Sequence, residues 1–173
     1  MRLEVKAVSI KDNWDDDLLA NDGDDEDTQA DKYLTFVLNE EEFGIEIRYV
    51  TEIIGIQKIT GVPDMPDYIK GVINLRGKVI PAMDVRLRFG MEERSYDDRT
   101  CVVVICVEEQ SVGLIVDRVS EVLDIPQGDI EPPPGGEIGE GRFNQGLGKV
   151  NGQVKILLNA GQLLFGMGQG DKW

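Results

Sequence analysis

The chain has 173 residues, enough for one or two small domains, and its 33 carboxylates against 18 basic side chains give a formal net charge of −15. Such a charge disfavours nucleic acid and anionic membrane surfaces as partners. The chain contains no histidine, the commonest general base and metal ligand. We therefore expect a protein without enzymatic activity, metal or cofactor, with catalysis by carboxylates alone as the remaining enzymatic alternative.

Residues 1–31 are predicted to form a disordered acidic tail. They contain eleven carboxylates and three basic residues, and the acidic stretch with Asp15–Asp17 and Asp22–Asp27 shows almost no apolar periodicity. The acidic runs lack the glycine and the closing glutamate of a calcium-binding EF-hand loop. The first ten residues form no apolar signal core, and no apolar run approaches the ~20 residues that span a bilayer. We expect a cytoplasmic protein that does not insert into a membrane.

The segment after the tail is predicted to be β-rich. Strand-like runs at Tyr33–Leu38 and Phe43–Ile47 flank a turn, and the second run alternates apolar residues with small or charged ones. A short helix is predicted at Asp67–Lys70, after two prolines. A hairpin follows, with its tip at Arg76-Gly77, and Asp84 is then predicted to cap a helical turn over residues 85–89.

The same order of elements returns in the second half of the chain. Strands are predicted at Cys101–Val107 and Val112–Val116, and a later hairpin has Asn151-Gly152 at its tip, the strongest short hairpin signal. Asn159 is predicted to cap a helical turn over residues 160–165. Cys101 and Cys106 lie five positions apart on one predicted strand, so they face opposite sides and cannot form a disulfide with each other.

The two halves are predicted to be copies of one module. In a first repeat alignment, Tyr33–Ile56 lies without a gap over Val102–Ile125. In a second repeat alignment, further along the chain and with a slightly larger offset, Gly71 falls on Gly146. Internal repetition decides the architecture, and a module of about 60 residues buries too little surface to be robust alone. We therefore expect two small β-barrels that pack side by side and share apolar surface.

Several segments resemble the CheW family of bacterial chemotaxis coupling proteins. The most specific are residues 49–55, residues 69–77 (Ile-Lys-Gly-Val-Ile-Asn-Leu-Arg-Gly) and Asp84-Val85-Arg86. The resemblance implies an all-β fold of two tandem SH3-like five-stranded barrels around a shared hydrophobic core, with short helical turns. It also implies a non-enzymatic scaffold that couples the cytoplasmic tips of methyl-accepting chemoreceptors to the regulatory domain of the histidine kinase CheA. The protein would then be recruited to membrane receptor arrays through these partners.

The resemblance covers residues 32–165. Residues 32–92 are expected to form the first barrel and residues 93–165 the second, with an exchange of terminal strands between them left open. Residues 166–173 are short and glycine-rich and are expected to be a flexible tail.

The resemblance also implies a receptor-docking surface in a groove between the barrels, and it indicates which residues form this surface. They are Val50, Glu52, Gly71, Arg76 and Val122, with Ile47 and Ile53 as weaker candidates because strand alternation equally points those two into a core. Kinase binding is expected on a separate face, with Glu131 and Pro132 as nominees. Two other functions stay open: a coupling module of another two-component pathway, and a small-ligand carrier with a pocket between the barrels.

Overall fold

The computed structural model describes residues 8–9, 29–133 and 143–165. The first half contains β1 (Val8–Ser9), β2 (Lys32–Leu38), β3 (Glu41–Glu46), the 3-10 helix η1 (Ile47–Tyr49), β4 (Val50–Gly55), β5 (Ile69–Leu75), β6 (Lys78–Asp84) and the helix α3 (Val85–Arg88). The second half contains β7 (Cys101–Val107), β8 (Gln110–Val116), β9 (Arg118–Asp124), η2 (Gln127–Asp129), β10 (Ile130–Glu131), β11 (Asn144–Val150), β12 (Gln153–Leu158) and the helix α4 (Ala160–Phe165). The predicted all-β fold is confirmed.

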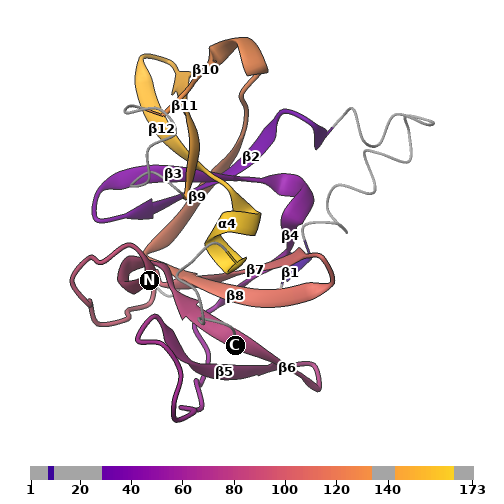
Figure 1. Cartoon of the computed structure of the whole chain (residues 1–173), viewed down its shortest axis with the longest axis vertical. Helices are drawn as coiled ribbons and strands as arrows, with labels where there is room; N and C mark the ends of the chain where they lie inside the picture. Colours follow the sequence, from indigo (N-terminus) through magenta and orange to yellow (C-terminus); the bar gives the residue numbers. More distant parts are fainter. Residues whose placement is uncertain (1–7, 10–28, 134–142, 166–173) are drawn as a thin grey trace.

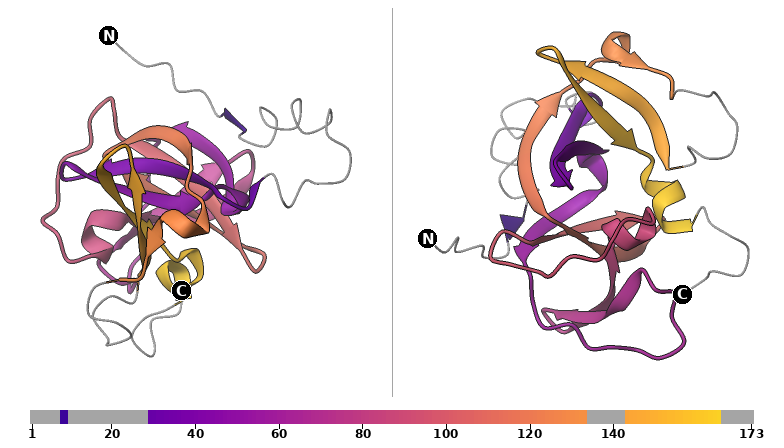
Figure 2. Two further views of the ribbon diagram at one scale, coloured as in Figure 1. Left: turned by 90° about the horizontal axis from the view of Figure 1, so that it is seen from above. Right: turned by 90° about the vertical axis from the view of Figure 1, so that its left-hand side faces the viewer.

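The strands form two six-stranded sheets, which lie one above the other along the long axis of the molecule (Figure 1). Sheet A has the order β1-β4-β7-β8-β6-β5, and sheet B has the order β10-β11-β12-β3-β2-β9. Both sheets are strongly curved, and β1 lies at the outside of the molecule (Figure 2). Within the segment expected to be disordered, Val8–Ser9 is thus a strand. Residues 1–7 and 10–28 of that tail, and the C-terminal tail 166–173, lie outside the described residues.

Each sheet contains strands from both halves of the chain. Sheet A joins β4, β5 and β6 to β7 and β8, whereas sheet B joins β2 and β3 to β9 through β12. The halves meet in two parallel pairs, with Ala82 opposite Gly113 and Leu157 opposite Gly44. These pairs are equivalent under the two repeat alignments. Neither sheet is built from residues 32–92 alone or from residues 93–165 alone, so a boundary between residues 92 and 93 does not separate one sheet from the other.

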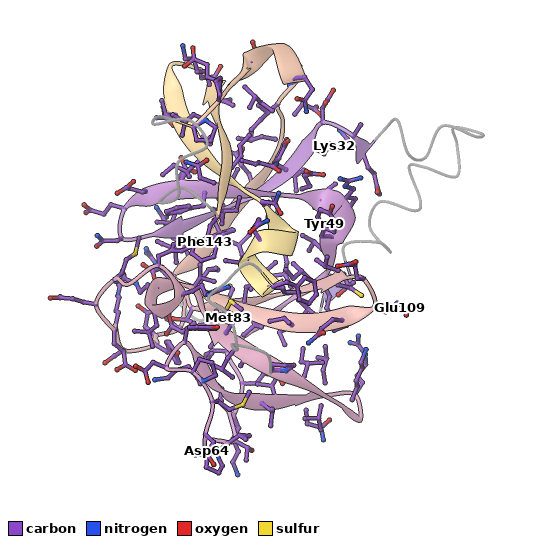
Figure 3. The ribbon with its side chains drawn as sticks, in the orientation of Figure 1. Lys32, Tyr49, Asp64, Met83, Glu109 and Phe143 are labelled. Carbon is purple, nitrogen blue, oxygen red and sulfur yellow. The ribbon has the colours of Figure 1, made fainter. Side chains whose placement is uncertain are left out.

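One apolar core lies between the sheets and draws on both halves. Its largest members include Phe36 and Ile45 from sheet B and Ile105 and Leu114 from sheet A. Met83 and Phe143 come from opposite halves and also belong to or pack against this core; Figure 3 labels both near the middle of the molecule. The expected sharing of one hydrophobic core is confirmed.

The turns and helix caps follow the local sequence. The tips Arg76-Gly77 and Asn151-Gly152 both have two residues at positive φ, the geometry of a type I′ hairpin. Asp84 Oδ1 accepts a hydrogen bond from the Leu87 N–H at 3.2 Å, and Asn159 Oδ1 accepts one from the Gln162 N–H at 2.9 Å. Both predicted N-caps are confirmed.

The helix predicted at Asp67–Lys70 is wrong. Ile69 donates its N–H to Pro66 O at 2.9 Å, which closes a single turn, and then pairs with Met83 as the first residue of β5. The Tyr68 carbonyl accepts the Asp84 N–H at 2.7 Å, so tertiary hydrogen bonds take the backbone groups that a helix would use. Both cysteines are free, with Cys101 buried and Cys106 half-buried.

Candidate protein-binding surface

The tip of the β5–β6 hairpin carries the arginine expected to bind a partner. Arg76 and Gly77 have φ values of 52° and 85°. The side-chain oxygen of Asn74 accepts a hydrogen bond from the Gly77 N–H at 2.9 Å. The backbone conformation and Asn74 thus stabilise the turn, which leaves the side chain of Arg76 available for other contacts.

Arg76 is paired with Glu52 of β4. Arg76 Nη1 donates to Glu52 Oε1 at 2.9 Å, and Nη2 donates to Oε2, so the contact is bidentate. The Glu52 side chain is 6% exposed, whereas the Arg76 side chain is 64% exposed. A buried carboxylate therefore orients a guanidinium that a partner can reach from solvent. The planar fork of arginine suits it to protein interfaces, where it binds carboxylates and carbonyls and stacks on aromatic rings.

Two half-buried apolar residues occupy equivalent positions in the two halves. The first repeat alignment places Ile53 of β4 on Val122 of β9, and both residues pack against the core between the sheets. Their remaining exposure allows contact with a partner. Ile47 and Val50 are only 3% and 1% exposed in the same core, so their side chains support β4 from inside.

Gly71 has a structural reason to be glycine. Its φ is +147°, and a Cβ built there would lie 2.1 Å from the Thr60 carbonyl oxygen. Thr60 and Val72 exchange two backbone hydrogen bonds of 2.9 Å, which hold the segment before β5 against that strand. Gly71 therefore allows this close approach and carries no side chain to a partner.

The second half lacks an equivalent of the Arg76–Glu52 pair. The repeat places Asn151 at the position of Arg76 and Glu121 at that of Glu52, and both residues are exposed. The hairpin geometry is thus duplicated while the buried ion pair is not. Of the two hairpin tips, only that of β5–β6 carries an arginine held by a buried carboxylate.

The two kinase-binding nominees lie far from the hairpin tip. Glu131 ends β10, which lies at the opposite end of the molecule from the β5–β6 hairpin (Figure 1). Glu131 and Pro132 are exposed, and Glu131 forms an ion pair of 2.8 Å with Lys149, itself largely exposed. An exposed pair of this kind adds little stability. These residues are available to a partner on a separate face.

A second charged cluster ties several segments together. The guanidinium of Arg86 donates to both carboxylate oxygens of Asp117, at 2.8 and 2.7 Å, and Arg94 and the Asn39 N–H also donate to that carboxylate. Burial acts to raise the pKa of Asp117, but these hydrogen bonds and the two arginine charges outweigh it and hold the pKa below its usual value. The cluster stabilises the linker between the halves.

A third arginine joins the two short helices. Arg88 of α3 donates from Nε and Nη2 to the Leu163 carbonyl of α4, at 3.0 and 2.8 Å. Its guanidinium lies 4.4 Å from the ring centroid of Tyr68 and 4.6 Å from that of Phe143. The second repeat alignment places Arg88 on Leu163, so this contact links the two halves of the repeat at equivalent positions.

Within the described ranges, no group of three or more histidine, cysteine, aspartate or glutamate side chains is placed to hold a metal ion. No helix in the same residues is long and apolar enough to cross a membrane.

Residues 32–165 match the family model of the CheW-like domain. The chain belongs to the CheW-like family. It is 37% identical to the chemotaxis protein CheW of Klebsiella aerogenes, over 80% of this chain and 84% of that protein. It is 32% identical to CheW of Helicobacter pylori, over 77% of this chain and 81% of that protein. The crystal structure of the scaffolding protein TtCheW from Thermoanaerobacter tengcongensis superposes with a TM-score of 0.74, at 34% identity, and covers 82% of this chain and 95% of that one.

The CheW-like domain holds Arg76 in a way that sequence reasoning missed. The sequence placed Arg76 and Glu52 on the same predicted docking surface but did not pair them. A signal was present, because strand alternation puts Glu52 in the buried phase with Val50 and Ile54. A buried carboxylate requires a donor or a cation, and Arg76 is that partner.

Proposed function

We propose that this CheW-like protein is a non-enzymatic scaffold that couples chemoreceptors to the histidine kinase CheA in the bacterial cytoplasm. Family membership supports the proposal, since relatives named chemotaxis protein CheW cover most of the chain. The solved relative is described as a scaffolding protein. Recruitment to receptor arrays at the membrane would occur through these partners.

The observation that carries the proposal is the exposed Arg76 guanidinium, which buried Glu52 holds in a fixed orientation. Such a guanidinium is a suitable anchor, and half-buried Ile53, the residue after Glu52 in β4, can pack against one face of a helix. We infer that a receptor helix lies along Ile53 and Val122 and meets Arg76 at one end. The other predicted docking residues would then have a structural role. Glu52 would orient the Arg76 side chain, and the strands would be held in place by Gly71, Val50 and Ile47.

The kinase would occupy a different face. β10, which ends in Glu131, lies at the opposite end of the molecule from the β5–β6 hairpin that carries Arg76 (Figure 1), so both partners could bind at once. A scaffold needs such separation, because competition between its partners would prevent coupling. The expected contact is with the regulatory domain of CheA.

A small-ligand carrier is less well supported. A cavity of about 490 Å³ is lined by Gln29, Ala30, Tyr33, Glu46, Arg48 and Gln127. Most of these side chains are polar or charged, whereas small-molecule sites are predominantly apolar with a few polar groups. A coupling module of another two-component pathway would bind a kinase regulatory domain without binding a chemoreceptor, and the experiment below distinguishes it.

The test measures binding of a receptor cytoplasmic fragment and of the CheA regulatory domain to the same variants. Arg76→Asn removes the guanidinium while keeping a residue that tolerates positive φ. Receptor binding should weaken by about 2 kcal/mol, roughly thirtyfold, and kinase-domain binding should stay within about twofold. Arg76→Asn combined with Glu52→Gln removes the unpaired buried carboxylate and should show the same receptor defect.

Asn151→Asp is the matched control, because it changes the equivalent hairpin tip and leaves the anchor intact. It should bind both partners like the wild type. Equal loss of both partners in Arg76→Asn would make Arg76 a structural residue. Failure of the wild type to bind either partner, or to support receptor control of kinase phosphorylation in a reconstituted mixture, would contradict the scaffold function.

A further inference from the structure

The strand that carries Glu52 and Ile53 has a covered outer edge. β4 pairs on its inner side with β7 and on its outer side with β1, with Val8 opposite Ile53 and Ser9 opposite Glu52. Without β1, sheet A would end at β4, and part of that strand's N–H and C=O groups would be open to another strand. The N-terminal segment thus meets β4 at the residues proposed to serve the receptor.

This pairing is an addition to the repeated fold. By the internal repeat, β9 is the counterpart of β4, and β9 is the terminal strand of sheet B in the described part of the chain. β1 also lies outside residues 32–165, the part that matches the CheW-like domain. It is therefore a property of this chain's own N-terminal segment and not of the duplicated module.

The covalent connection makes so short a strand effective. Residues 10–28 join β1 to the point where the described chain resumes. Because β1 and β4 belong to one chain, their pairing is intramolecular, which raises the effective concentration of β1 at β4 above that of a separate strand. Two paired residues bind weakly in isolation, so the covered state should be easily displaced by a partner that binds the same place.

We propose that Val8–Ser9 adds to the outer edge of β4 as an intramolecular strand and competes there with the receptor for the surface around Glu52 and Ile53. The competition rests on the proposed receptor-coupling function, whereas the strand addition does not. Release of β1 is then a step in receptor binding, and any modification or partner that holds the N-terminal segment elsewhere strengthens coupling.

The test replaces both β1 residues by proline in the full-length chain, Val8→Pro with Ser9→Pro. Proline cannot donate to a strand ladder, and neither change alters the charge of the tail. Ala20→Pro with Asn21→Pro is the control for proline in the same acidic segment. Amide hydrogen exchange of residues 50–55 should be at least threefold faster in the β1 variant and unchanged in the control. The dissociation constant for a chemoreceptor cytoplasmic fragment should fall at least threefold in the β1 variant only.

The outcomes separate the two proposals. Unchanged exchange in β4 overturns the strand addition. Faster exchange with unchanged or weaker receptor binding overturns the competition. Faster exchange in a protein that binds no receptor fragment in any form overturns the scaffold function and the competition with it, while the strand addition stands. Equal tightening in the control overturns the role of β1.

Discussion

Most of the charged residues buried inside this domain are paired across elements that are distant in sequence. Among the described residues, the buried charged ones are Glu52, Asp84, Arg86, Arg88 and Lys155. Each has a partner from another element, as in the bond between Lys155 and Glu42 that joins β12 to β3. Burial of a charge destabilises the folded state unless the charge is hydrogen-bonded. Removing one partner should therefore lower the free energy of unfolding by more than the intact pair contributes to it.

Gly71 gives a residue-scale test of close packing. Gly71→Ala would put a methyl group 2.1 Å from the Thr60 carbonyl oxygen, at a positive φ, so the free energy of unfolding should fall by about 2 kcal/mol or more. Gly61→Ala is the matched control, because nothing lies within 4 Å of its added carbon. It should change stability by less than about 0.5 kcal/mol in urea denaturation. Equal effects of the two substitutions would contradict a structural role for Gly71.

Asp117 should make stability depend on pH. Its pKa is lower in the folded protein than in the unfolded chain, where it is about 3.9, so the stabilisation is complete above that value. It is lost as pH falls through the folded pKa, because the proton then binds the unfolded state more readily than the folded one. Asp117→Asn should lose about 3 kcal/mol at pH 7, since it leaves buried Arg86 without its carboxylate, and less near pH 3.

The measurement is urea denaturation of wild type and Asp117→Asn between pH 3 and pH 7. Asp98→Asn, an exposed carboxylate in the same linker, is the control and should follow the wild type. Parallel curves for wild type and Asp117→Asn would show that this carboxylate does not contribute to acid sensitivity.

These ion pairs could not be predicted from local sequence. Arg76 and Glu52 are 24 residues apart, and Arg86 and Asp117 are 31 apart. Strand alternation could indicate that Glu52 is buried, but only the tertiary contact between β4 and the tip of the β5–β6 hairpin shows which cation reaches it. Resemblance to the family placed Arg76 and Glu52 on one predicted surface but did not indicate that the two side chains form an ion pair.

At the scale of elements, prediction succeeded where hydrogen bonds are local. The two hairpin tips and the caps at Asp84 and Asn159 involve residues at most three positions apart. The helix at Asp67–Lys70 failed because Asp84 and Met83 draw this segment into β5. β1 was missed because it spans only two residues of a segment predicted to be disordered, and its pairing depends on the outer edge of β4.

The contact between α3 and α4 is the element-scale test. Arg88 is buried between the Tyr68 and Phe143 rings and donates twice to the last turn of α4. Arg88→Lys keeps the charge but loses the planar fork, so it should cost about 2 kcal/mol in the free energy of unfolding. Thermal denaturation followed by circular dichroism measures this. Arg99→Lys, an exposed arginine, is the control, and equal melting temperatures would contradict the role of Arg88.

At the scale of the whole molecule, the internal repeat predicted a shared core but not which strands close each sheet. The repeat alignments show that two modules exist, and they are equally compatible with separate and with exchanged strands. Exchange is decided by the parallel pairs of β3 with β12 and of β6 with β8, which join distant residues. These pairs make each sheet dependent on both halves of the chain.

This dependence predicts that neither half folds alone. Residues 1–92 lack β7 and β8, which lie in the middle of sheet A, and residues 93–173 lack β2 and β3 of sheet B. Each fragment would also expose its part of the core between the sheets, which favours aggregation. Mixed or co-expressed fragments should associate and recover the dispersed amide NMR spectrum of the intact chain. A cooperative unfolding transition in either isolated fragment would show that the halves are independent barrels, whereas recovery only on mixing would show that the exchanged strands are what hold the domain together.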